Sequence, residues 1–499
     1  MQLTYVKTDN KDVNTAYYIA VSDVIGNIKP FQGELWEKEE PVIIAGMGYD
    51  TPWTRDAAIN VMNAGGLLFP EVSENTLLSV LKRDRVGFII DGQYWDKIIW
   101  VLGAWHLYRI TAKTDFLLTA YQATRNTLTY MEETEFDEKL NLFRGAACYG
   151  DGVAAYPDRY IAPSKSSGIM SFIEECPERL VKTGMGLPMY TLSTNCLYYQ
   201  AYITADLMAE ELGIKKEYGI EQEYGIKQEY GIKQEHGIKN EYRQKAERMK
   251  EAINTHFWNP ERDLYDYLVD DQGGCDSSEG LGQAFAILFG IADKDKAESI
   301  FANQPITPYG IACVYPSFER YRQTGKYHFG RHSGTVWPHI QAFWADAAAR
   351  HGKLDIFLKE FHMLTDVSVR DGLFAEIYHP ETGEIYGGLQ EGGEGGIILW
   401  KSQLKQTWSA TGYLRLLFHV IAGIRFEKEG ISFAPCLPDG IGQIEITNLH
   451  IRGTVFTIRI NGRGSKIKHF CVDSKETDDK FVPYGSGCVK EIAIVMEYE

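Results

Sequence analysis

The sequence predicts a mainly α-helical domain of paired helices followed by a small antiparallel β domain. Over about residues 55–425, apolar residues recur at three- and four-residue spacing, which is the period of an amphipathic helix. After Arg425 the pattern changes to alternating apolar and polar residues between turns that contain glycine or proline, which indicates strands. Helical hairpins arranged around an axis, with their loops gathered at one end, account for the first part.

The helical segments follow one another through much of the chain. They are expected over residues 95–110, 116–131, 194–212, 242–257, 281–289, 296–300, 335–351 and 404–421. The first two are joined by a short polar connection, as in an antiparallel helical hairpin. The connections 143–193 and 387–398 are long, and long loops in a compact domain are usually functional or disordered.

Strands are expected over residues 431–434, 443–446, 455–460 and 491–495. The change of pattern divides the chain into a helical domain, 1–425, and a C-terminal β domain, 426–499. Near 214–241 a hexapeptide recurs with small changes, beginning with Glu-Tyr-Gly-Ile. A six-residue step does not keep Tyr and Ile on one helix face, so this segment is predicted to be a solvent-facing insertion.

The charge of the chain excludes several classes of partner. A formal net charge of −17 argues against nucleic acid, anionic membrane surfaces and polyanionic substrates, and leaves neutral sugars compatible. No stretch is apolar enough to cross a membrane, and the first residues lack the features of a signal peptide, so a cytoplasmic location is expected unless an export signal was removed. The eight cysteines show no zinc or CxxC spacing, and no cofactor or metal is expected.

The first candidate site contains Tyr49, Trp53, Arg55 and Asp56, directly before an apolar helical run. Aromatic rings can stack on a sugar, and an Arg–Asp pair can bond its hydroxyl groups. The alternative interpretation is an acid favoured by the dipole at a helix N-terminus, with Arg55 as its surface partner. That alternative explains Asp56 but leaves the two aromatic residues unexplained.

The second candidate is Asp151, in a Gly-Asp-Gly turn between Tyr149 and Tyr156. A carboxyl group in such an aromatic setting would be kept protonated and could act as a general acid. A plain turn needs no function, because Asp and Gly favour turns. The third candidate is the segment with His332 and Trp337, which is either a wall of a sugar subsite or core packing at the start of a helix.

The fourth candidate is Glu376, close to a His-Pro-Glu-Thr-Gly turn, where a carboxylate could activate water. An exposed turn acid is the alternative. Downstream, Glu391, Trp400 and Lys401 belong to a concentration of acids, glycines and indoles that is unusual for a solvated loop. They are added as candidate substrate-binding residues.

In this order the motifs resemble the six-hairpin glycosidases, the (α/α)6-barrel enzymes that include glucoamylases, trehalases, processing α-glucosidases and glycogen-debranching-type glucosidases. The resemblance implies that Trp53, Arg55 and Asp56 bind the sugar at the non-reducing end of the substrate. It implies that Asp151 is the general acid and Glu376 the general base. The segment Gly334–Pro338 resembles the family's Gly-x-x-Trp-Pro entry to an inner helix, and Trp400-Lys401-Ser402 resembles a following Trp-Ser element.

The tail, with Leu437–Gly440 and Arg452-Gly453, resembles the β domain of maltose-phosphorylase-type and rhamnosidase-type relatives. One departure concerns the acid. Glucoamylases carry a Glu-rich loop where this chain has Gly-Asp-Gly, so Glu174 or Glu175 is an alternative general acid.

By this resemblance the chain is expected to be an inverting, exo-acting hydrolase of a glucoside-type bond in an oligosaccharide or other glycoside. The two carboxyl groups of an inverting pair lie roughly 6.5–9.5 Å apart. Two rivals share the scaffold. One is a phosphorylase, in which phosphate replaces water, and the other is a sugar epimerase or binding toroid, for which His332 and His339 could provide paired imidazoles.

Overall fold

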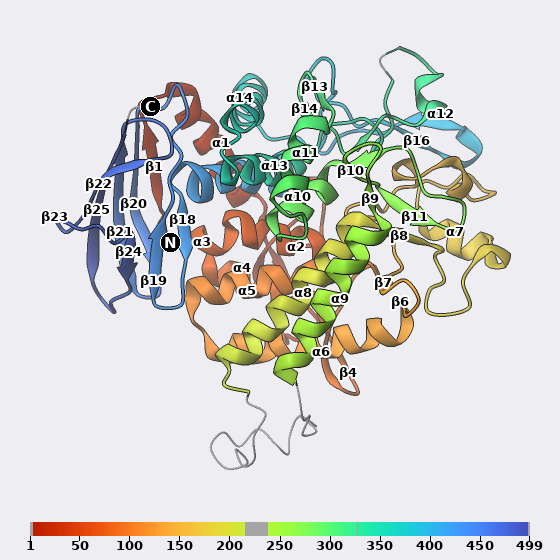
Figure 1. Ribbon diagram of the computed structural model, residues 1–499, viewed down its shortest axis with the longest axis horizontal. Coiled ribbons are helices and arrows are strands. Elements are labelled where there is room, and N and C mark those ends of the chain that lie inside the picture. The colour runs from red at the N-terminus through yellow and green to blue at the C-terminus, as the bar shows by residue number, and fades with distance from the viewer. Residues whose placement is uncertain (1–2, 215–237, 327, 498–499) are drawn as a thin grey trace.

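Helices account for 43% of the protein, and strands form a layer along one side of it (Figure 1). A computed structural model describes residues 3–214, 238–326 and 328–497. Figure 1 shows the C-terminal strands beside the helices, with both ends of the chain on the same side. Most of the predicted insertion at 214–241, with its hexapeptide repeat, lies outside the described residues.

Helices from distant parts of the chain form a closed ring. Each ring helix contacts the next one along the chain, and the last contacts the first. The ring helices are α2 (Thr54–Asn60), α5 (Trp100–Thr111), α8 (Leu192–Glu211), α10 (Gly280–Leu288), α13 (Pro338–Arg350) and α15 (Thr407–Arg415). Most of their residues are buried, as expected of helices that pack against other helices on several faces.

A second set of helices packs outside the ring, with α4 and α6 against α5, α9 against α8, α14 against α13 and α1 against α15. The outer helices are α1 (Lys11–Gly26), α4 (Pro70–Leu78), α6 (Thr114–Thr134), α9 (Ile238–His256), α11 (Lys294–Asn303) and α14 (Leu354–Asp371). Three shorter helices are α3 (Gly66–Leu68), α7 (Met170–Glu175) and α12 (Glu319–Arg322).

The eight predicted helical segments all overlap observed helices, but their ends differ. The segment expected from Thr335 begins as a helix only at Pro338, because proline fixes the backbone angle that suits the first helical position. The segment 404–421 becomes α15 followed by a π-helical stretch, Leu416–Ile421. Helix α1 was missed, although the Asn10 side chain accepts hydrogen bonds from the backbone of Asp12 and Val13, a recognisable N-cap. Helix α14 was missed as well.

Two sheets form the strand layer. The larger has the order β1-β20-β21-β25-β22-β23, and the smaller has the order β18-β19-β24. Their bounds are β1 (Tyr5–Thr8), β18 (Ile424–Phe426), β19 (Gly430–Phe433), β20 (Gln443–Ile451), β21 (Thr454–Asn461), β22 (Ile467–Val472), β23 (Lys475–Glu476), β24 (Phe481–Pro483) and β25 (Val489–Met496).

The pairing differs from the prediction in two respects. Strand β21 pairs with β25 in parallel, so the layer is not wholly antiparallel. Strand β1, from the start of the chain, pairs with β20, so the predicted helical domain contributes one strand to the β layer. Buried isoleucines of β20, β21 and β25 share one apolar cluster with α1, α14 and α15, which fixes the layer against the helices.

Short pairs of strands form within the loops between the helices. They are β2 (Ile28–Phe31) with β3 (Glu40–Ile43), β4 (Leu81–Asp84) with β5 (Gly87–Ile90), β6 (Phe136–Asp137) with β7 (Leu142–Phe143), β8 (Met189–Thr191) with β11 (Leu268–Asp270), β9 (Trp258–Asn259) with β10 (Leu264–Tyr265), β12 (Ser278–Glu279) with β15 (Val314–Tyr315), β13 (Ile306–Thr307) with β14 (Gly310–Ile311), and β16 (Leu389–Glu391) with β17 (Ile397–Leu399). The long glycine-rich connection therefore contains a hairpin, β16–β17.

Candidate active site

A hollow lies where α2, α13 and α15 begin. Each of these helices has a lining residue at or near its first turn, so the hollow is at the N-terminal end of these ring helices. The lining residues are Tyr49, Trp53, Arg55, Asp56, Gln93, Tyr149, Asp151, Arg331, Trp337, Glu376 and Trp408. Eight of these eleven are candidates selected from the sequence.

Asp151 enters the hollow from the connection between β7 and β8. Its Oδ2 lies 3.0 Å from Nη2 of Arg55, and its Oδ1 lies 3.7 Å from Nε2 of His332. Burial acts to raise the pKa of Asp151, but the positive charges of Arg55 and Arg331 outweigh burial and hold this pKa below its usual range. Asp151 is therefore ionised in this arrangement, although the prediction from its aromatic neighbours was a protonated carboxyl.

Glu376 reaches the hollow from the segment after α14 and is almost completely buried. Its Oε1 accepts a hydrogen bond of 3.2 Å from the hydroxyl of Tyr49, and its Oε2 accepts a longer one of 3.4 Å from the backbone N–H of Gln403. Burial raises the pKa of Glu376, and Arg331, with Nη2 3.6 Å from Oε1, opposes that rise. A buried carboxylate with fixed partners on each oxygen is well oriented for proton transfer.

The Tyr49 turn is joined directly to the Glu376 segment. The Gln403 side chain lies against Gly48, and a Cβ on that glycine would come within 2.1 Å of Gln403 Oε1. Gly48 thus permits the close approach that brings the Tyr49 hydroxyl to Glu376. This contact joins two candidate sites that are 327 positions apart in the sequence.

Arg55 is the centre of an acidic cluster at the start of α2. Its guanidinium donates to Gln93 at 2.9 Å and to Asp96 at 3.3 Å in addition to Asp151. Its Nε lies 3.9 Å from Asp56, whose pKa burial raises to about 8. The interpretation of Arg55 as a surface partner is therefore wrong, since only 8% of the residue is exposed.

Aromatic rings form much of the remaining wall. Trp53 is 50% exposed, which leaves its ring accessible to a substrate. Tyr149, Trp337 and Trp408 also line the hollow but are almost completely buried. Trp53 has a φ of +46°, a strained conformation for a side chain of its size. Strain of this kind is concentrated at binding and catalytic sites.

Four candidate residues are not part of the lining. His332 is fully buried behind Trp337, on which it stacks at 4.8 Å, and burial lowers its pKa to about 3. Glu391 is held by Arg320 at 2.9 Å and by the Tyr321 hydroxyl at 2.7 Å, so its carboxylate is occupied away from the hollow. Trp400 stacks under Arg331 at 5.0 Å, and Lys401 is exposed.

The alternative acids are not part of the lining either. Glu175 accepts hydrogen bonds from the backbone and hydroxyl of Ser164, at 2.8 and 2.6 Å, and Glu174 is exposed. Asp151 is therefore the candidate acid that reaches the hollow.

Sequence reasoning missed Arg331, Gln93 and Trp408 among the lining residues. Arg331 directly precedes the His332–His339 segment, so a search widened by one residue would have included it. Trp408 belongs to the run of indoles after Glu391 but was not selected. Gln93 lies in a loop without a chemical motif, and no signal in the sequence indicates it.

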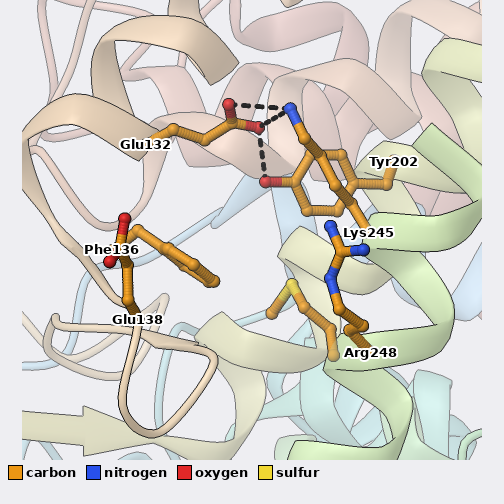
Figure 2. A pocket seen from close by; sticks show the side chains of 7 residues that line it. Glu132, Phe136, Glu138, Tyr202, Lys245 and Arg248 are labelled. Carbon is orange, nitrogen blue, oxygen red and sulfur yellow. Dashed lines mark hydrogen bonds and ion pairs between the residues drawn. The ribbon is translucent and has the colours of Figure 1, made fainter. Parts of the chain in front are cut away.

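A second cavity lies on the outside of the ring, between α6, α8 and α9. Figure 2 shows Lys245 pointing to the carboxylate of Glu132, which also accepts a hydrogen bond of 2.6 Å from Tyr202. The remaining lining residues are Phe136, Glu138, Arg248 and Met249. This ion pair ties α9 to α6 and is separate from the hollow.

In the described part of the chain, no group of three or more His, Cys, Asp or Glu residues is arranged to hold a metal ion. Nor is any helix among those residues long and apolar enough to cross a membrane.

Two family models match parts of the chain. Residues 230–409 match the mannosylglycerate hydrolase MGH1-like glycoside hydrolase domain, and residues 424–474 match the C-terminal domain of glycosyl hydrolase family 65. Both models describe domains of glycoside hydrolases. The resemblance of the chain to the six-hairpin glycosidases, predicted from the sequence, is confirmed. Comparison with curated protein sequences gives no match.

Solved structures share the fold at low sequence identity. A family 78 rhamnosidase of Bacillus sp. GL1 has a TM-score of 0.60 at 13% identity, covering 100% of this chain and 44% of that one. A sialidase has a TM-score of 0.64 at 14% identity, covering 97% and 41%. The GH63 mannosylglycerate hydrolase of Thermus thermophilus, in complex with glucose, has a TM-score of 0.55 at 13% identity, covering 81% and 100%. The chain thus spans less than half of the first two relatives.

Proposed function

We propose that the protein is an inverting, exo-acting glycoside hydrolase that cleaves a glucoside-type bond in an oligosaccharide or other glycoside. Asp151 is the general acid and Glu376 the general base. The observation that carries the proposal is that these two carboxyl groups, 225 positions apart in the sequence, line one hollow together with indole and phenol rings. Proton donation and water activation require two such groups around one bond.

The architecture proposed for this chemistry is an (α/α)6 toroid over residues 1–425 with a β domain over 426–499. The closed ring of α2, α5, α8, α10, α13 and α15, with further helices packed outside it, supports a toroid. Loops at the N-terminal ends of the ring helices supply the lining residues, which agrees with a site at one end of the toroid.

The lining residues suit distinct tasks in hydrolysis. Glu376 takes a proton from water while Tyr49 and the Gln403 backbone hold its carboxylate in place. Asp151 protonates the departing oxygen. Arg55 and Asp56 bond sugar hydroxyl groups, and the exposed face of Trp53 stacks on the ring.

A panel of α- and β-linked glucosides, mannosides and rhamnosides tests the proposal. Glucosides are tested first, because the structure of a protein with the same fold was solved in complex with glucose. We expect hydrolysis of one glucoside with release of the terminal sugar, and proton NMR of the first product should show the anomer opposite to that of the substrate. Retention of configuration would contradict the inverting mechanism, and sugar 1-phosphate formed on addition of phosphate would indicate a phosphorylase.

A further inference from the structure

Arg331 is a cation that faces both proposed catalytic carboxyl groups. Burial raises the pKa of Glu376 and acts in the same direction on Asp151, and the charge of Arg331 opposes burial at both. Tyr49, Asp56 and Asp151 also face Glu376, and none of the three carries a positive charge. Arg55 lines the same hollow but is paired with Asp151, so Arg331 is the cation that acts directly on Glu376.

The side chain of Arg331 is held in a narrow space. Its guanidinium lies 5.9 Å from the ring centre of Trp337 and 5.0 Å from that of Trp400. Its carbonyl accepts a hydrogen bond of 3.0 Å from Nε1 of Trp337, and its N–H donates to Leu389 at 2.8 Å. A Cβ on Gly388 would lie 2.5 Å from the Cα of Arg331. The chain just before β16 therefore packs closely against the backbone of Arg331. The two indoles therefore hold the guanidinium of Arg331 in place beside the hollow.

The contact between Arg331 and Glu376 is electrostatic and not a hydrogen bond. Nη2 lies 3.6 Å from Oε1, beyond hydrogen-bond distance, and the buried Nε has no acceptor among the described residues. An ionised carboxylate has about four lone-pair positions. Tyr49 and Gln403 use two of them. The distance of Arg331 leaves the others free to take a proton from water.

We propose that Arg331 is a positioning residue that keeps Glu376 ionised through space while leaving its oxygen lone pairs available to the attacking water. This inference rests on the proposed role of Glu376 as general base. An arginine that made a bidentate hydrogen bond would also stabilise the anion, but it would occupy the oxygens that the reaction needs.

The test is the pH profile of kcat/KM in Arg331→Gln and Arg331→Lys, with the surface change Arg322→Gln as the matched control. The limbs of this profile report the ionisation of the two catalytic carboxyl groups, Asp151 and Glu376, and Arg331 faces both. In Arg331→Gln the acidic limb should move upward by about 1–3 pH units, the effect of losing an opposite charge at this distance. Arg331→Lys keeps a charge and should move the limb less than half as far, and Arg322→Gln should leave it in place.

A titration without substrate gives the same information. In protein labelled with carboxyl-13C glutamate, the resonance missing from Glu376→Gln belongs to Glu376, and its midpoint should rise in Arg331→Gln. If Arg331→Gln does not fold, Arg331→Met, which keeps an aliphatic stem between the indoles, is titrated instead. An unmoved limb and midpoint, equal shifts in the Gln and Lys variants, or a change in KM alone would overturn the inference. If Glu376→Gln retains hydrolysis, the proposed function fails instead.

Discussion

Nη2 of Arg55 lies 3.0 Å from Oδ2 of Asp151 and joins the first turn of α2 to the long connection before α8. Burial acts to raise the pKa of Asp151, but this contact, with Arg331, holds that pKa below its usual range. In its proposed role as general acid, Asp151 must carry a proton when the bond breaks. That role requires substrate binding to weaken the contact, and sugar hydroxyl groups that bind Arg55 would do so by taking its N–H donors.

Asp151→Asn should separate substrates by their leaving groups. Protonation matters most for a poor leaving group, so turnover of an alkyl glycoside should fall by about 10²–10⁴-fold, while a dinitrophenyl glycoside, which leaves without a proton, should lose much less. The measurement is kcat for both substrates. Asp50→Asn, an exposed aspartate one residue after Tyr49, is the control and should leave both rates unchanged. An equal loss for both substrates would remove Asp151 from the role of acid.

Glu376→Gln should lower turnover by about 10²–10⁴-fold, because glutamine keeps the shape of the side chain but takes no proton. The exposed Glu381, five positions further on, provides the matched change Glu381→Gln, which should retain wild-type activity. Thermal unfolding of both variants checks that the fold is kept. Near-wild-type hydrolysis by folded Glu376→Gln would contradict its assignment as base.

The sequence predicted the residues of the hollow where a local motif carried the signal. Trp53, Arg55 and Asp56 lie within one turn of each other, and Asp151 and Glu376 each lie in a short segment with a recognisable composition. Glu391 was wrongly selected as a substrate-binding residue because the acids, glycines and indoles around it have the composition of a reactive loop. Its partners Arg320 and Tyr321 lie 71 and 70 positions away in the sequence, and only the fold brings them together.

The missed elements have related causes. Strand β1 has too few residues to show a period, and its partner β20 is more than 430 positions away. The π-helical turn after α15 has the same apolar pattern as the helix it continues, so the widening of the helix depends on packing and not on local sequence. Two contacts of Arg331 that point to a functional role, with Glu376 and Trp400, are made to residues 45 and 69 positions further along the chain, so only the fold shows them.

Trp53 provides a test in which binding and stability change in different ways. Trp53→Ala and Trp53→Gly both remove the exposed ring, so both should raise KM by a similar factor. At a φ of +46°, alanine keeps the backbone strain and glycine relieves it, so Trp53→Gly should be more stable than Trp53→Ala by about 1 kcal/mol. Urea unfolding and steady-state kinetics measure the two effects. If the alanine variant is the more stable one, the backbone at this position is not strained.

Buried histidines should make the protein sensitive to mild acid. His419 is enclosed between the carbonyl groups of Asn63 and Ile424, at 3.0 and 3.5 Å. Burial, with the nearby Arg415 and Arg425, lowers its pKa to about 3, against about 6.5 in the unfolded chain. Because the unfolded chain binds the proton more readily, this contribution to stability is complete above pH 6.5 and is lost as pH falls toward 3.

The rate of that loss is about 1.4 kcal/mol per pH unit for each such histidine. Between pH 7 and pH 5 the free energy of unfolding should therefore fall by about 2 kcal/mol on account of His419 alone. Urea unfolding at the two pH values measures this fall, and His419→Gln, which cannot be protonated, should show a fall smaller by that amount. His469→Gln, which changes a surface histidine with a 49% exposed side chain, is the matched control and should behave as the wild type does. A wild-type protein and a His419→Gln variant that lose stability in parallel would show that His419 is not buried in its neutral form.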